Sequence, residues 1–167
     1  MTIVDWAALK TTDFPSRMDE RVLAVLPLGA VEQHGPHLPL GTDSTILAGL
    51  LDALRGRELA GGRALLLPLL PIGSSPEHKG FPGTLTVEAE TLLALWCDVA
   101  RSALRTGVRR LLFLNSHGGN GALADVAAFR LRDEAGVIAA ALTTHRFGAP
   151  DGMLDETERR YGIHGGH

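Results

Sequence analysis

Runs of apolar residues alternate along the chain with stretches in which apolar residues recur every three or four positions. The runs predict four strands, at 22–28, 63–70, 109–114 and 137–142. The periodic stretches predict helices over about 43–57, 87–106 and 122–134, with a shorter one near 154–160. Strands joined through helices are typical of an α/β sheet, and the nearly continuous apolar run at 22–28 favours a central strand covered on both faces.

Length and composition narrow the class of protein. The chain has 167 residues, enough for one domain with a real core, and we find no internal repeat and no linker. Hydrophobic residues make up 45% and charged residues 21%, which excludes a disordered chain. The formal net charge is -3 and no segment concentrates Lys or Arg, so we expect no nucleic-acid partner.

Membrane insertion and disulfides are also excluded. The longest uncharged apolar stretch, residues 64–72, is too short to span a bilayer and contains Pro68 and Pro71. Cys97 is the only cysteine, and the N-terminus has no basic segment followed by an apolar one. We therefore expect a soluble, cytoplasmic protein, in which Cys97 and the neighbouring Trp96 are core residues.

Polar residues follow the ends of the predicted strands, where ligands bind in open α/β sheets. They are Glu32, His34, His37 and Asp43 after the first predicted strand, Glu77 and His78 after the second, Asn115, His117 and Asn120 after the third, and His145 after the fourth. No histidine lies within a predicted helix. A lone loop histidine is more often a surface residue than a ligand, but this clustering favours a metal site.

Four of these residues have the chemistry of ligands for zinc and similar ions. In an extended loop Glu32 and His34 face the same side, and Asp43 at the start of a helix can bridge two ions. His117 adds a ligand from another strand end. Beside it, Gly118 and Gly119 form either a tight turn or an amide site for an oxyanion, and His78 is either a loop-stabilising or a functional residue.

At these positions the sequence resembles the creatininase family of metal-dependent amidohydrolases. The segments that carry the resemblance are PLGAVEQHGPHLPLGTD (27–43), PIGSSPEHKGFPGTLT (71–86), NSHGGN (115–120) and the terminal YGIHGGH (161–167). The resemblance implies a three-layer α/β/α fold with a mostly parallel sheet, two divalent ions (zinc first, manganese or iron otherwise) and a homo-oligomer, often a hexamer. It implies metal ligands at Glu32, His34, Asp43 and His117 with Asp43 bridging, an active-site histidine at His164, and substrate contact at Ser75.

The sequence also departs from the family pattern. Many relatives take a fifth ligand from a glutamate shortly after the late histidine, a position just beyond His167, and creatinine-hydrolysing members take it from the position of Gly119. We therefore expect residues 1–167 to form one domain that is incomplete at its C-terminus. No tryptophan lies between residues 145 and 167, which disfavours creatinine as the substrate.

The resulting hypothesis is hydrolysis of a non-peptide or cyclic amide C–N bond in a small molecule by a metal-bridging hydroxide. His164 is the expected proton donor, with Glu77 or His78 as outer candidates, and the amides of Gly118 and Gly119 assist the oxyanion. The absence of a Gly-x-Ser-x-Gly motif disfavours a serine nucleophile. The alternatives are deformylation, peptide trimming or opening of a cyclic ketone by a related metal-dependent hydrolase, and an inactive truncated fragment that binds one ion or none.

Overall fold

The computed structural model describes residues 2–15, 18–55, 62–148, 151–153 and 155–157. Five strands form one parallel sheet in the order β1-β3-β2-β4-β5. Their bounds are β1 Thr2–Asp5, β2 Val22–Leu28, β3 Arg63–Leu66, β4 Arg110–Asn115 and β5 Ile138–Thr143. The central position of β2 is as predicted.

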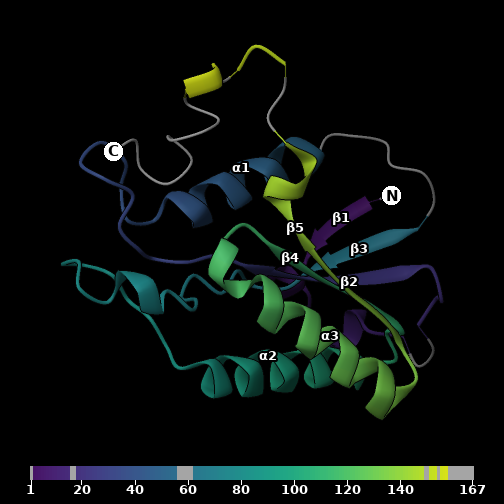
Figure 1. Cartoon of the computed structure of the whole chain (residues 1–167). Coiled ribbons are helices and arrows are strands. Elements are labelled where there is room, and N and C mark those ends of the chain that lie inside the picture. The colour runs from purple at the N-terminus through teal and green to yellow at the C-terminus, as the bar shows by residue number, and fades with distance from the viewer. Residues whose placement is uncertain (1, 16–17, 56–61, 149–150, 154, 158–167) are drawn as a thin grey trace.

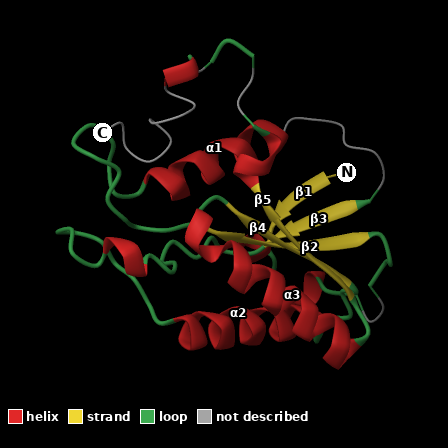
Figure 2. Ribbon diagram, in the orientation of Figure 1, coloured by secondary structure: helices red, strands yellow, loops and turns green. Residues whose placement is uncertain are grey.

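Within the described residues, three long α-helices lie on the two faces of the sheet. They are α1 (Thr42–Arg55), α2 (Ala89–Leu104) and α3 (Gly121–Ala135). In Figure 1, α1 lies on one face of the sheet, while α2 and α3 lie side by side on the other. The ribbon in Figure 2 shows the same three layers, which confirms the expected α/β/α architecture. No helix in the described part of the chain has the length and apolar character needed to cross a membrane.

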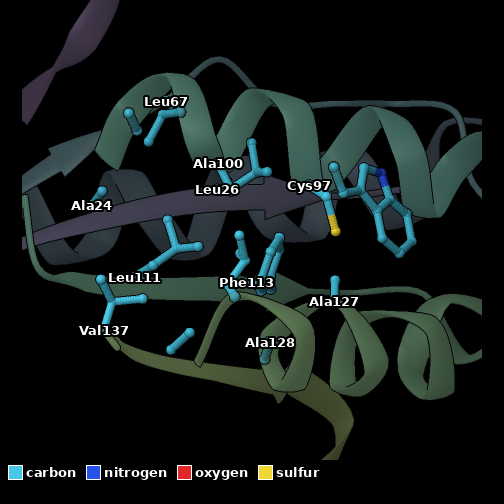
Figure 3. Packing of buried hydrophobic residues seen from close by; sticks show 14 of the residues in the cluster. Ala24, Leu26, Leu67, Cys97, Ala100, Leu111, Phe113, Ala127, Ala128 and Val137 are labelled. Carbon is cyan, nitrogen blue, oxygen red and sulfur yellow. The ribbon is translucent and has the colours of Figure 1, made fainter. Parts of the chain in front are cut away.

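Side chains on β2 alternate between the two layers of core. Ala24, Leu26 and Leu28 belong to the larger cluster, which lies against α2 and α3. Figure 3 shows Leu26 and Phe113 of this cluster between the helices, near Cys97. Val25 belongs to the smaller cluster, in which Leu47 of α1 packs on the opposite face. Both Cys97 and Trp96 are buried, as predicted.

The structure differs from the predicted elements at two strands. β1 was not predicted, since it has only four residues, two partly buried and two exposed, at the edge of the sheet. The strand predicted to reach residue 70 ends at Leu66, because Pro68 has no N–H to donate to a ladder. The N–H groups of Leu67 and Leu70 still donate to carbonyls of β2, at 2.9 and 3.0 Å, so the segment keeps following its neighbour.

Glycines end the two helices on the α2/α3 face, as their sequence positions predicted. Gly136 adopts a left-handed conformation with φ of 59°, and its N–H donates to the Arg132 carbonyl at the end of α3. Gly107 has φ of 94° just after α2. Of the short helix expected near 154–160, the structure describes only residues 155–157.

Candidate metal centre at the carboxyl ends of the strands

The register of the sheet brings the candidate ligands together. Leu28 at the end of β2 pairs with Asn115 at the end of β4, so the loops that follow these strands leave the sheet side by side. The first loop carries Glu32 and the second carries His117. Asp43 joins them from the first turn of α1.

Three side chains form the tightest group. Nδ1 of His117 lies 2.9 Å from Oε1 of Glu32 and 3.2 Å from Oδ2 of Asp43. One ligand atom from each residue lies within 4.8 Å of the other two. Glu32 is 0%, His117 2% and Asp43 7% exposed. Two carboxylates and an imidazole converge here away from bulk water, an arrangement that is expensive without a cation.

His34 lies on the other side of Asp43. Its Nε2 atom is 3.6 Å from Oδ1 of Asp43, whereas Oδ2 faces His117. The ring Nδ1 lies 3.1 Å from the backbone carbonyl of Glu32, which can only accept a hydrogen bond. In the neutral imidazole the proton is therefore on Nδ1, and Nε2 is available as a ligand atom. The two oxygens of Asp43 thus face two different imidazoles.

The orientation of His117 is set from behind the ring. Its Nε2 atom donates to the Ser74 carbonyl at 2.8 Å and lies 3.2 Å from the Ser75 hydroxyl. With the proton held on Nε2, the neutral ring presents Nδ1 to the two carboxylates. A partner that fixes the tautomer in this way is common behind metal-ligating histidines.

The charge of His117 reflects these neighbours. Burial lowers the pKa of His117, but the carboxylates of Asp43 and Glu32, together with the Ser74 carbonyl, outweigh burial and raise this pKa to about 10. In the metal-free protein the imidazole is therefore a cation at neutral pH, and it partly neutralises the two acids. A metal ion must displace the proton on Nδ1.

The donor set fits a divalent metal ion. Carboxylate oxygen and imidazole nitrogen are the usual protein ligands of zinc. Asp43 Oδ2 is buried, and its contact with His117 lacks the geometry of a hydrogen bond, so this oxygen retains acceptor capacity. Glu32, Asp43 and His117 can hold one ion, and Asp43 and His34 offer ligand atoms toward a second.

Two buried asparagines hold the loops of the centre in place. Asn120 Nδ2 donates to the Gly29 carbonyl at 3.0 Å, and its Oδ1 accepts from the N–H of Ser74. Asn115 Oδ1 accepts from the N–H of His117, and its Nδ2 donates to the His117 carbonyl. The NSHGGN motif was the only signal in the sequence for these roles, which sequence reasoning did not assign.

The remaining predicted site residues lie outside the group formed by Glu32, Asp43 and His117. Ser75 is fully buried against His117, so its contact with substrate stays a prediction. Glu77 is exposed, and with Glu32 and His78 it forms a second group whose ligand atoms lie within 4.8 Å of one another. Gly118 and Gly119 are exposed in the short helix η4 (Gly118–Asn120) before α3. His164 lies outside the described residues.

Comparison with known proteins identifies the family. The family model described as creatinine amidohydrolase, or creatininase, matches residues 7–167. The chain therefore belongs to the creatininase family.

Two curated relatives illustrate the range of the family. The chain is 42% identical over 102 residues to a mycofactocin precursor peptide peptidase of Mycobacterium tuberculosis, and the match covers 58% of this chain and 40% of that protein. It is 36% identical over 101 residues to a creatinine amidohydrolase of Pseudomonas putida, covering 58% of this chain and 37% of that protein. The chain thus spans less than half the length of these relatives.

Solved creatininase structures have the same fold. A mutant creatininase superposes with a TM-score of 0.73 at 26% identity, covering 97% of this chain and 68% of that one. A manganese creatininase and a Zn-Zn form of a mutant creatininase have TM-scores of 0.67 and 0.70, at 26% and 28% identity. Each of the two covers 90% of this chain and 62% of the solved chain.

Proposed function

We propose that the protein is a metal-dependent hydrolase that cleaves an amide C–N bond in a small, non-peptide or cyclic substrate. The observation that carries the proposal is the convergence of Glu32, Asp43 and His117, three buried ligands within 4.8 Å of one another at the carboxyl ends of the strands. Membership in the creatininase family supports the same reaction class.

The centre would hold two divalent ions, zinc in the first instance. Glu32, Asp43 and His117 would hold the first, while Asp43 and His34 would contribute to the second, because the two oxygens of Asp43 face opposite imidazoles. The manganese and Zn-Zn forms of solved creatininases support both metals. Within the described residues the second ion has fewer ligands than the first, so we expect it to bind more weakly. Assembly into a homo-oligomer such as a hexamer stays a prediction.

A bound divalent ion lowers the pKa of water and polarises a carbonyl oxygen, which is the chemistry that amide hydrolysis needs. The chain supplies the rest. Glu32 and Asp43 add negative charge that neutralises the cation, and Ser74 keeps the ring of His117 in one orientation. Gly118 and Gly119, exposed residues directly after His117 in the chain, would donate their backbone N–H groups to an oxyanion. His164, with His78 or Glu77, would give the leaving nitrogen its proton.

A peptide bond is the second candidate substrate. The similarity to a mycofactocin precursor peptide peptidase, at 42% identity, favours it specifically. Hydrolysis of a peptide and of a cyclic amide needs the same ions and the same oxyanion donors, so the metal ligands do not distinguish the two substrates. Turnover measured on both kinds of substrate distinguishes them.

The experiment is turnover by zinc-loaded and manganese-loaded protein on a panel that contains creatinine, other cyclic amides and short peptides. We expect cleavage of at least one amide, loss of turnover after chelation, and recovery when the ion is returned. Glu32→Gln keeps the size of the side chain but removes its charge and is expected to abolish turnover, whereas Asp52→Asn on the exposed side of α1 is the matched control. Turnover that survives chelation, or that is unchanged in Glu32→Gln, would contradict the proposal.

A further inference from the structure

His78 lies next to the metal centre but outside its tightest group. Its Nε2 atom is 3.8 Å from Oε2 of Glu32, the oxygen of that carboxylate that does not face His117. The His78 side chain is 15% exposed and comes from the short helix η3 (Pro76–His78), in the segment between β3 and α2. Together with Glu77, this placement allows either a further metal ligand or a residue that orients Glu32.

Hydrogen bonds on the far side of the ring distinguish these roles. The N–H of Gly35 donates to Oε1 of Gln33 at 2.9 Å, which fixes the orientation of that amide. The amide nitrogen of Gln33 therefore faces Nδ1 of His78, at 3.1 Å. An amide nitrogen can only donate, so Nδ1 accepts.

The neutral ring of His78 consequently carries its proton on Nε2, the atom that faces Glu32. A nitrogen that binds a metal ion has no proton, so this tautomer does not suit a metal ligand, whereas its N–H is attracted to the neighbouring carboxylate. Neighbouring residues keep Gln33 and the ring of His78 in place. The backbone N–H of Gln33 donates to the Thr84 hydroxyl, and the ring of Phe81 packs edge-on against His78, with centroids 5.9 Å apart.

We propose that His78 is a positioning residue: its Nε2–H, on the tautomer set by Gln33, attracts Oε2 of Glu32 across 3.8 Å, longer than a direct hydrogen bond, and so favours the orientation in which Oε1 faces His117 and the first metal ion. The role extends the proposed metal centre and rests on it. In this role His78 is not a metal ligand, although it lies close to Glu32. Glu32 is then positioned indirectly by Gln33, whose own orientation depends on hydrogen bonds with Gly35 and Thr84.

Two substitutions at His78 separate positioning from ligation. His78→Gln places an amide donor near the position of Nε2, whereas His78→Ala removes the donor. The probe is Zn²⁺ alone, in competition with a chromophoric chelator. We expect His78→Ala to weaken binding of the first zinc ion by about 10- to 100-fold with an unchanged number of ions per chain, and His78→Gln to restore most of that loss. His37→Ala, at an exposed histidine of the Glu32 loop, is the matched control and should bind as wild type does.

A ligand role would give a different pattern. Both substitutions would then lower the number of zinc ions bound per chain, and glutamine would not rescue; that result overturns the proposal. Zinc affinity in His78→Ala equal to that of wild type overturns it as well.

The tautomer can be measured without any metal, so it tests the positioning role separately from the proposed function. In ¹⁵N NMR spectra of the metal-free protein at pH 8, we expect the wild-type ring of His78 to carry its proton on Nε2. In Gln33→Glu the new carboxylate still accepts from Gly35 but draws a proton onto Nδ1 of His78, and zinc affinity should fall. A wild-type ring protonated on Nδ1 and bare at Nε2 overturns the proposal. Failure of the wild-type protein to bind zinc would overturn the proposed metal centre. The tautomer of His78 would still show whether Gln33 sets the proton on Nε2.

Discussion

The Nδ1 atom of His117 lies 2.9 Å from Oε1 of Glu32, although the two residues follow different strands of the sheet. The pairing of Leu28 with Asn115 explains the contact, because it places the ends of β2 and β4 at the same level. The parallel sheet thus brings two distant segments of sequence together before any ion is bound.

Zinc binding should release a proton. The pKa of His117 is about 10 in the metal-free protein, so at pH 7.5 a metal ion must displace the proton on Nδ1. We expect the apparent zinc affinity to rise about tenfold for each pH unit between pH 7 and 9, with about one proton released per first ion bound. Calorimetric titrations in buffers of different ionisation enthalpy measure the number directly. Zinc binding without proton release would contradict the assigned charge of His117.

The stability of the metal-free protein should fall as the pH rises. The folded pKa of His117, about 10, lies above the ordinary value of 6.5, so its stabilising contribution is complete below pH 6.5 and is lost as the pH rises through 10. We expect the free energy of unfolding to decline over this window by at most about 1.4 kcal/mol per pH unit. Urea unfolding in the presence of a chelator measures it. The His117→Gln variant, which lacks the group, should show a flatter profile, and equal slopes in the two proteins would count against the prediction.

Gly119 should tolerate no side chain. A Cβ atom there would come 2.6 Å from Nε2 of His117 and still closer to the backbone oxygen of Ser74, whereas a Cβ at Gly118 would have no atom within 4 Å. We expect Gly119→Ala to cost about 1–3 kcal/mol of stability and to weaken zinc binding, because the imidazole must move. Gly118→Ala is the matched control. Thermal unfolding and zinc titration check both, and equal behaviour of the two variants would show that the ring is not confined.

Much of the fold could be predicted from hydrophobic pattern alone. The residues of β2 were predicted at their observed bounds because a central parallel strand is apolar on both faces. β1 was not predicted because a four-residue edge strand, with two exposed and two partly buried residues, has no distinctive hydrophobic pattern. β3 was predicted too long, because a propensity for extended structure does not show where Pro68 interrupts the ladder.

The candidate ligands could also be predicted, but the hydrogen bonds that orient the histidines could not. Glu32, His34, Asp43 and His117 stood out because acids and histidines gathered after strand ends. The structure brings three of them into one group and places His34 beside Asp43. The carbonyl of Ser74 and the amide of Gln33 orient two histidines through hydrogen bonds that depend on the tertiary arrangement of loops. No spacing in the sequence encodes such contacts.

The most direct test of the metal centre is elemental analysis by mass spectrometry of protein loaded with excess zinc and then gel-filtered. The wild-type protein and the Asp52→Ala control, altered on the exposed side of α1, should retain at least one zinc ion per chain. Asp43→Ala should remain folded by circular dichroism and lose most of the zinc, because Asp43 contacts both imidazoles. Equal zinc content in wild type and Asp43→Ala, whether high or near zero, would contradict the account.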